Sequence, residues 1–452
     1  MERKNLAVGN LIKSLDFGSS IAESDNLLEA ARIETSAFTD LLSDRVDLIP
    51  GTKGSGKSAL FRMVVDFLPD FLLKQRKVVV AHGVQHPGDP IFQAFNKEFS
   101  KLSEQEFVSF WCIYLVSLAH EQFIKGERYT EYLSNASKEI DSFRIACQNA
   151  NIPEIKAKKS LHNILEWTLE VLSKWRPKIK YKSPDVGEIE VDLFGQPQKV
   201  TNIDDKDRDA LPTYVKQVKQ SLEAVLEKSQ LSLWLMIDRL DEIFPRRSSL
   251  ERTALRGLLR AMRFFESNTI RVKVFLRDDM LDQVVRGSEG FTALTHITAR
   301  QADTLRWKED QILSMVVKRL FVGNQRLAQH LKIDLKRVEA STDYREQAFY
   351  KVFATTVHRG PKQTTTLRWI YNRCADGRGV VTPRDVIDLL SRAKQRQQDE
   401  FIANPDDTSS FIIGPSALQY GLAELSKRKR QTYLQAEFPH LWSNIEKFVG
   451  GK

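Results

Sequence analysis

The chain has 452 residues, which is enough for two or three domains with sizeable hydrophobic cores. Its formal charge of +9 suits an acidic partner, and both a nucleotide and a nucleic acid qualify. Three scattered cysteines argue against a disulfide framework or a zinc site. Because the sequence has no signal segment and no apolar run of ~18–20 residues, we expect a cytoplasmic protein with no membrane contact.

A glycine-rich motif lies between the first predicted strand and the helix that follows it. The spacing of residues 26–42 predicts a helix, the apolar run 46–49 a strand, and residues 58–65 a second helix. The pattern G-x-x-x-x-G-K-[ST] is matched at every required position by Gly51, Thr52, Lys53, Gly54, Ser55, Gly56, Lys57 and Ser58.

The strand–loop–helix context separates this motif from a surface loop that carries a stray lysine. Glycines let backbone N–H groups converge on phosphate oxygens, and the start of the next helix adds a positive dipole end. Lys57 would reach the β- and γ-phosphates, and the hydroxyl of Ser58 would bind Mg²⁺. The motif predicts that the chain binds a nucleoside triphosphate.

The next segments continue the α/β order. Residues 78–81 predict a second strand, and a turn at residues 89–90 precedes a predicted helix from 91 to about 100. Residues 103–124 have the apolar spacing of a long buried helix. Its large apolar side chains are expected in the core and not in a ligand cage: Phe107, Phe110, Trp111, Tyr114 and Leu115.

Residues 126–230 interrupt this order. They predict two polar helices, followed by alternating segments at 178–182 and 188–194 that are typical of an exposed hairpin. A segment of this length inside such a core is usually functional or binds a partner. The two strands carry opposite charges, however, and pairing between the strands is sufficient to explain them.

A second acidic motif follows the apolar run 233–237, which is typical of a buried parallel strand. Asp238 ends this run. Because the carboxyl ends of parallel strands share one edge of a sheet, Asp238 is expected beside the glycine-rich loop, where it would hold Mg²⁺ through water. Glu242 or Asp241 would orient and deprotonate the attacking water, and the choice between them is open. Alternatively, the acidic residues only cap the next helix.

The predicted helix at 249–266 carries a basic face. Steps of four, four and three residues keep its arginines together, and apolar residues occupy the opposite positions. These arginines are Arg252, Arg256, Arg260 and Arg263. Three interpretations are open: a solvated stripe, an arginine finger offered to the nucleotide of a neighbouring subunit, or a phosphate track for DNA or RNA.

The remainder of the chain is predicted to be helical. Helices are expected at 305–320, 350–357 and 367–374, and another begins at Thr382-Pro383-Arg384, where proline suits the first turn. A polar linker at 404–410 follows. The basic run Lys427–Arg430 is typical of a solvated helix face, with nucleic-acid contact as the alternative.

These motifs together resemble the STAND and neighbouring AAA+-related ATPases, and in particular bacterial P-loop ATPases found near antiviral defence genes. The resemblance rests on GTKGSGKSA, on the strand that ends in DRLDE, and on a later strand, 272–277. It implies that Arg277 senses the γ-phosphate and that Arg384 is a lid arginine of the sensor-2 kind. Residues 17–18 and 22–25 correspond to the segment that contacts the base, although Ala22 replaces the usual arginine.

Motifs of other nucleotide-binding classes are missing from the sequence. It has no ABC signature, no N-K-x-D guanine motif and no protein-kinase motif. ATP is therefore favoured over GTP.

We therefore expect an α/β P-loop NTPase core at 1–300, interrupted at about 126–230, a helical lid at 301–403, and a winged-helix-like module at 404–452. The resemblance implies a Mg²⁺-dependent ATPase that acts as a molecular switch, through homo-oligomerisation or a protein effector encoded nearby, in antiviral defence. Two alternatives stay open: a nucleic-acid-binding ATPase similar to an origin-binding initiator, and a scaffold in which ATP is structural.

Overall fold

The computed structural model describes residues 9–83, 102–150, 179–183, 187–191, 210–242, 248–285, 291, 294–404, 411–435 and 439–448. The chain forms two units, each assembled from separate stretches of sequence. Unit 1 contains residues 1–43, 51–63 and 304–452, and unit 2 contains residues 44–50 and 64–303. The predicted helix at 91–100 lies outside the described residues.

Unit 2 is built on a four-stranded parallel sheet with the strand order β1-β6-β5-β2. The strands are β1 (Leu48–Gly51), β2 (Val78–Gly83), β5 (Ser232–Ile237) and β6 (Ile270–Arg277). Nearly all of their residues are buried, because helices cover the sheet, and this explains why the strands read as continuous apolar runs. The predicted α/β core, a parallel sheet with flanking helices, is therefore confirmed.

The outer side of β1 is not an open edge. Gln301 forms a parallel bridge with Leu48, the N–H of Asp47 donates to the carbonyl of Arg300 at 2.7 Å, and the N–H of Ala302 donates to the carbonyl of Leu48 at 2.8 Å. Residues 300–302 thus extend the sheet beyond β1. This places β1, which leads into the Gly51–Ser58 loop, inside the sheet and not at its rim.

The long helix predicted at 103–124 is present as α6 (Glu104–Ala119) and its continuation η3 (His120–Ile124). Ser103 and Glu106 form a capping box that fixes its start. Its aromatic residues are buried as expected, and the indole N–H of Trp111 donates to the carbonyl of Ala254 at 2.9 Å. By length and composition this stretch could cross a membrane, but 72% of its apolar window is buried within the protein. It is therefore a core helix.

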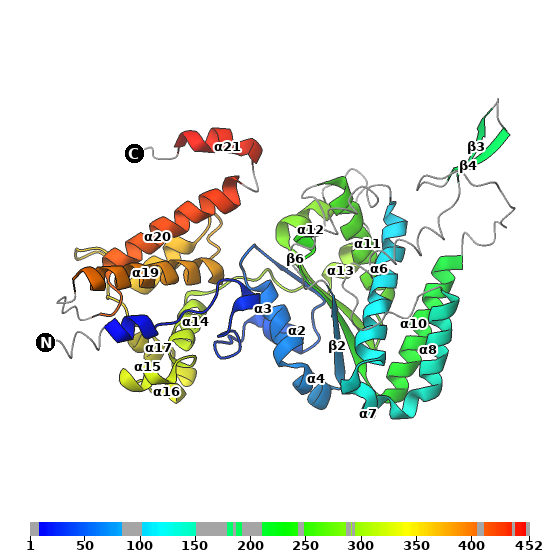
Figure 1. Ribbon diagram of the computed structural model, residues 1–452, viewed down its shortest axis with the longest axis horizontal. Helices are drawn as coiled ribbons and strands as arrows, with labels where there is room; N and C mark the ends of the chain where they lie inside the picture. The colour runs from blue at the N-terminus through cyan, green and yellow to red at the C-terminus, as the bar shows by residue number, and fades with distance from the viewer. Residues whose placement is uncertain are drawn as a thin grey trace. The chain divides into compact units, whose positions relative to one another are not determined.

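Two helices from the 126–230 segment also belong to the core of unit 2. α8 (Ser137–Asn149) and α10 (Ala210–Ser229) lie side by side (Figure 1), and Phe143 and Val218 are fully buried in the same cluster as the sheet. The predicted hairpin is also present. Its strands β3 (Ile179–Ser183) and β4 (Gly187–Val191) are antiparallel, and the register places lysines opposite glutamates.

The other elements of unit 2 complete the layers around the sheet. Gly257 allows a close crossing of α11 (Ser249–Phe265) over α6, because a Cβ at this position would lie 2.5 Å from the Cβ of Phe107. The other elements of unit 2 are η2 (Met63–Phe67, which begins in unit 1), α4 (Pro69–Arg76), η4 (Glu127–Tyr129), α7 (Thr130–Leu133), η5 (Ser134–Ala136), η7 (Leu240–Glu242), α11 (Ser249–Phe265), α12 (Asp278–Val285) and α13 (Leu294–Thr298).

Unit 1 is helical in its described parts and has its own apolar core. Its elements are η1 (Ala22–Ser24), α2 (Ser36–Leu42), α3 (Lys57–Arg62), α14 (Glu309–Phe321), α15 (Gln325–His330), α16 (Leu335–Ala340), α17 (Thr342–Phe349), α18 (Thr366–Cys374), α19 (Pro383–Ala403), α20 (Pro415–Lys429), η8 (Arg430–Gln435), α21 (Pro439–Ile445) and η9 (Glu446–Phe448). The predicted helices at 305–320, 367–374 and 383 onward correspond to α14, α18 and α19.

Two helix predictions in unit 1 were wrong. The helix expected at 26–42 exists only from Ser36, because Thr35 caps its start by accepting the N–H of Phe38. The helix expected at 350–357 is absent, since α17 ends at Phe349. The following residues form a parallel bridge from Phe353 to Ile413 instead.

The C-terminal segment packs directly on α19. Gly421 of α20 allows this contact, because a Cβ there would lie 2.5 Å from the carbonyl oxygen of Leu389. Residues 415–435 and 439–448 are helical, and the described part of this segment shows no β-hairpin of the kind that forms a wing. The winged-helix-like module stays a prediction.

Candidate functional site

The Gly51–Ser58 loop joins β1 to α3, as its sequence predicts. Gly54 has φ of +84° and Gly56 has φ of +101°, both in the left-handed region that side chains with a Cβ rarely adopt. Gly56 is also the residue before α3, so its conformation turns the chain into the helix. The two glycines of the motif are therefore required by the backbone path of the loop itself.

Polar side chains line the inside of this loop. The ammonium of Lys57 donates to the carbonyls of Gly51 at 2.7 Å and Thr52 at 2.8 Å, which holds it over the loop. The hydroxyl oxygens of Thr52 and Ser55 are buried without a hydrogen-bond partner. A buried hydroxyl without a partner is unfavourable, and an anion with several acceptor oxygens would satisfy it. The loop therefore has the donors that a phosphate group requires.

The Gly51–Ser58 loop contacts the helical part of unit 1 at two places. The indole N–H of Trp307 donates to the carbonyl of Ser55 at 2.7 Å, and the indole ring also lies against Gly56. Arg384, in the first turn of α19, lies over Gly54. A Cβ at Gly54 would be 3.0 Å from the Cβ of Arg384 and 3.3 Å from its Cδ. The predicted lid arginine is thus beside the predicted phosphate loop.

A mainly apolar hollow opens next to the same loop. It contains about 610 Å³ of space free of protein atoms, part of it open to solvent, and all its lining residues belong to unit 1. Leu28, Phe38 and Ala59 contribute apolar surface, and Trp307 and Arg319 also line it. An apolar hollow with a few polar groups is the usual form of a site for a planar organic ligand.

A buried ion pair borders this hollow. The guanidinium of Arg319 donates to both carboxylate oxygens of Asp25, at 3.1 and 2.6 Å, and also to the carbonyl of Phe17 at 2.8 Å. The side chains of Asp25 and Arg319 are only 2% and 6% exposed. The pair joins the 17–25 segment to α14, and the resemblance assigned base contact to this segment.

The carboxyl ends of β1, β5 and β6 share one edge of the sheet, as parallel strands require. Asp238 directly follows β5 at this edge and is 3% exposed. Arg239 then adopts a left-handed conformation with φ of +63°, which turns the chain into η7. Glu242 ends η7, and its side chain lies outside the described residues.

Arg277 ends β6 at the same edge and is held by two carboxylates. Its Nε and Nη2 donate to the two carboxylate oxygens of Asp279, both at 2.9 Å. Its Nη1 approaches Asp241 at 3.4 Å. One of the two candidate bases is therefore bound to the predicted phosphate sensor.

The basic face of α11 is only partly a surface stripe. Arg256 is buried, and its Nε and Nη2 donate to the carbonyl of Val284 at 3.2 and 3.1 Å. Arg260 pairs with Glu104, and both guanidinium groups lie over the ring of Phe291, at 5.5 and 5.2 Å. Arg256 and Arg260 therefore stabilise contacts inside unit 2. This arrangement weakens the interpretation of the four arginines as a continuous phosphate track.

The Lys427–Arg430 run is also partly used inside the protein. Arg428 donates to Asp388 at 3.0 Å and Lys429 donates to Asp385 at 2.8 Å, so both attach α20 to α19. Two residues of the run therefore contact α19, and the run is only partly the solvated helix face that was predicted.

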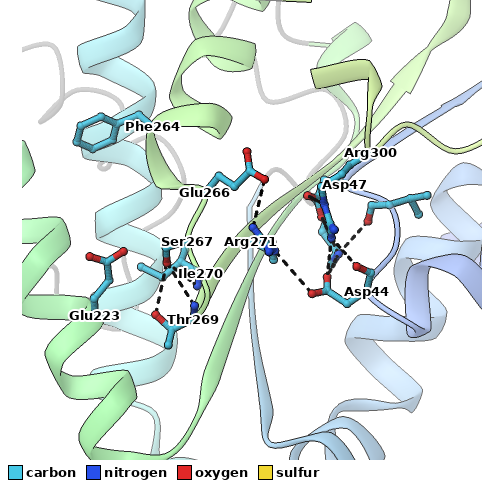
Figure 2. A network of polar contacts seen from close by, with 12 residues as sticks. Asp44, Asp47, Glu223, Phe264, Glu266, Ser267, Thr269, Ile270, Arg271 and Arg300 are labelled. Atoms are coloured by element: carbon cyan, nitrogen blue, oxygen red, sulfur yellow. Dashed lines mark hydrogen bonds and ion pairs between the residues drawn. The ribbon is translucent and has the colours of Figure 1, made fainter. Parts of the chain in front are cut away.

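A charged cluster that sequence reasoning missed lies at the amino end of the sheet (Figure 2). Lys273 is fully buried, and its ammonium donates to Asp44 at 2.6 Å, to Asp47 at 2.9 Å and to the carbonyl of Val46 at 2.9 Å. Arg300 donates to Asp47, and Arg271 pairs with Asp44. A lysine within the apolar strand 270–277 is the sequence signal that could have revealed this cluster.

No protein-family model, curated protein or solved structure matches this chain. The residues and their geometry are therefore the basis for a functional assignment.

Proposed function

We propose that this protein binds ATP with Mg²⁺ on the Gly51–Ser58 loop and hydrolyses it, as a P-loop ATPase. The observation that carries the proposal is the position of Arg384 over Gly54, because the sequence motif of the loop and the motif of the lid are 330 residues apart in the chain and meet in one unit. The Nε of Arg384 also donates to the carbonyl of Ser20 at 3.4 Å, so the protein itself fixes part of its position. An anion on the loop would use the loop N–H groups and this guanidinium together.

The phosphates would be held by the backbone N–H groups of the loop and by Lys57, and the hydroxyls of Thr52 and Ser55 would gain acceptors. Mg²⁺ would be bound by Ser58 and, through water, by Asp238. Bound there, it would neutralise charge on the transferring phosphate.

The hollow beside the loop suits the purine base. Its apolar walls would bury the ring, and Trp307 and Arg319 at its border supply an aromatic surface and a guanidinium. Adenine is favoured over guanine because the sequence lacks a guanine-specific motif. The Asp25–Arg319 pair would keep the 17–25 segment at this border.

Glu242 or Asp241 would act as the catalytic base. Asp241 accepts a hydrogen bond from Arg277, so a change at Asp241 would also disturb that arginine. Arg277 would stabilise the charge on the γ-phosphate in the transition state.

ATP binding between the loop and the 301–403 lid would make the protein a switch. Closure of the lid would order Arg384 on the γ-phosphate, and hydrolysis would release it. The output that we propose, homo-oligomerisation or control of a protein effector in bacterial antiviral defence, rests on the resemblance to STAND and AAA+-related ATPases.

The decisive experiment is ATP turnover by the purified protein, measured with Mg²⁺ and with EDTA. We expect turnover that requires Mg²⁺ and is lost in Lys57→Ala and in the variant of the catalytic base, Glu242→Gln or Asp241→Asn. Retention of ATP binding without turnover in the wild type would instead support a scaffold in which ATP is structural.

Double-stranded DNA is the second variable of this experiment. Because Arg256 and Arg260 are used internally, we expect turnover to be indifferent to DNA. Stimulation by DNA that weakens steeply with salt would favour the nucleic-acid-binding ATPase instead.

A further inference from the structure

Arg271, the second residue of β6, is paired only loosely, and Figure 2 shows it between Glu266 and Asp44. Its Nη1 donates to Glu266 at 3.4 Å, and its Nε lies 3.7 Å from the carboxylate of Asp44. That Nε is buried and has no hydrogen-bond partner among the described residues. Charge-assisted hydrogen bonds are about 2.7–2.9 Å long, and Glu266 is 47% exposed, so water screens this ion pair. The guanidinium of Arg271 therefore retains donors for a further partner.

The carboxylates of Asp44 and Asp47 are already balanced by other cations. Lys273 contacts Asp44 at 2.6 Å and Asp47 at 2.9 Å. Arg300 also pairs with both carboxylates. Two cations and two carboxylates thus balance one another, and the charge of Arg271 is in excess. An arginine with excess charge is suited to bind an anion, because its planar fork of N–H donors matches the oxygens of a carboxylate or a phosphate.

Arg271 lines a hollow at the amino edge of the sheet. The hollow contains about 680 Å³ of space free of protein atoms, part of it open to solvent, and all its lining residues belong to unit 2. Val78 and Trp234 contribute apolar surface to it. Polar side chains come from Ser232, Asn268 and Thr269. The volume is in the range of sites for small organic molecules, roughly 300–1,000 Å³, and a mixture of apolar surface and a few polar groups is typical of them.

Arg76 supplies a second guanidinium to the same hollow. It is exposed in the last turn of α4, and within the described part of the chain its side chain forms no hydrogen bond or ion pair. A cation at this position also suits the negative end of the helix dipole, but Lys74 in the same turn does so as well and does not line the hollow. The hollow thus has two arginines, and the carboxylate among its lining residues, Asp44, is already bound by Lys273.

We infer that this hollow binds the phosphate group of a small organic molecule, with Arg271 and Arg76 as its guanidinium ligands. The site goes beyond the proposed ATPase, since none of the residues that line it belongs to the Gly51–Ser58 loop. Arg271 and Arg277 also lie near opposite ends of the eight-residue strand β6, about 20 Å apart. Phosphate is favoured over carboxylate because its third oxygen and its second charge match two guanidinium groups and the hydroxyls of the hollow.

The test is equilibrium binding of phenyl phosphate to the full-length protein, measured by titration calorimetry, with benzoate and inorganic phosphate as comparison probes. Phenyl phosphate should bind more tightly than either. Benzoate lacks the phosphate oxygens, and inorganic phosphate lacks the ring that Val78 and Trp234 would cover. Arg76→Ala and Arg271→Gln should each weaken the binding of phenyl phosphate by about tenfold, the size of one charge-assisted hydrogen bond. Glu266→Gln should strengthen it, because a carboxylate near Arg271 is removed.

Lys74→Ala is the matched control for Arg76→Ala, because both residues are exposed in the last turn of α4 and of the two only Arg76 lines the hollow. Lys57→Ala should leave the binding of phenyl phosphate intact, which separates this site from the proposed ATP site. The melting temperature of Arg271→Gln should be recorded beside its affinity, and Arg76→Ala tests the site without a change in the core.

Four results would overturn the inference: no binding of phenyl phosphate to the wild type, complete loss of binding in Lys57→Ala, equal losses in Lys74→Ala and Arg76→Ala, or benzoate bound as tightly as phenyl phosphate. Absence of ATP turnover would overturn the proposed function and not this site.

Discussion

The indole N–H of Trp307 donates to the carbonyl oxygen of Ser55 at 2.7 Å, and the backbone carbonyl of Trp307 in turn accepts the hydroxyl of Tyr371 at 2.9 Å. This chain of two hydrogen bonds joins the Gly51–Ser58 loop to α18. Because Trp307 lies against Gly56 and lines the apolar hollow, any ligand on the loop changes the surroundings of the indole. The Trp307–Ser55 hydrogen bond therefore connects the loop to the helical part of unit 1, and the fluorescence of Trp307 can report on a ligand bound to the loop.

Trp307→Phe should remove the fluorescence response to ATP. We expect ATP to change the intrinsic tryptophan fluorescence of the wild type, and the variant to lose most of this change. The variant should also bind ATP about three- to tenfold more weakly, because one hydrogen bond of about 1 kcal/mol to the loop is lost. Trp369→Phe is the control, since Trp369 is buried in the same unit but does not line the hollow. An equal response in the two variants would contradict the role of Trp307.

Arg384→Ala should weaken ATP binding and turnover by about tenfold or more, as expected for loss of a charge-assisted contact to phosphate. The physical reason is the position of Arg384 over Gly54 in the first turn of α19. Arg392→Ala, two turns later on the exposed side of the same helix, is the control for charge and helix propensity. If the two variants hydrolyse ATP at the same rate, Arg384 is a surface residue and not part of the site.

Lys273→Met should lower the free energy of unfolding by about 3–5 kcal/mol, because it removes a cation that two carboxylates share inside the protein. Lys273 is fully buried, and Asp47, whose side chain is 11% exposed, would lose its ammonium contact with little water to replace it, whereas Asp44 is 38% exposed and can be solvated. Urea titration of the variant checks this value. Lys74→Met is the control, since Lys74 is exposed on α4, and it should change the stability by less than about 0.5 kcal/mol.

The three cysteines should resist thiol reagents in the folded protein. Burial raises the pKa of the Cys147 thiol to about 12, and it also raises the pKa of the thiols of Cys112 and Cys374. At pH 8 the reactive thiolate is therefore scarce and shielded. Alkylation with iodoacetamide should be slow in buffer and fast in concentrated urea. A thiol that reacts equally fast in both conditions would show that its packing differs from the fold described.

Structural features that depend on only three to five neighbouring residues can be predicted from the sequence. The left-handed glycines at 54 and 56, the apolar strands 78–81 and 233–237, and the buried aromatic side of α6 each follow from a short period or a tight turn. A backbone that must turn sharply requires glycine whatever surrounds it. The helix predicted at 350–357 failed because a contact between distant segments, the bridge between Phe353 and Ile413, determines this segment.

Sequence patterns thus specified the strand–loop–helix motif, the acidic strand end and most helices, because spacing and propensity act within a few residues. Contacts between distant segments determine which charged side chains are paired within the protein. Arg256 donates to a carbonyl 28 residues away, Arg277 pairs with both Asp241 and Asp279, and Arg384 lies beside the Gly51–Ser58 loop across the chain. The role of a charged side chain depends on the partner and the burial that folding supplies, and no local period encodes either.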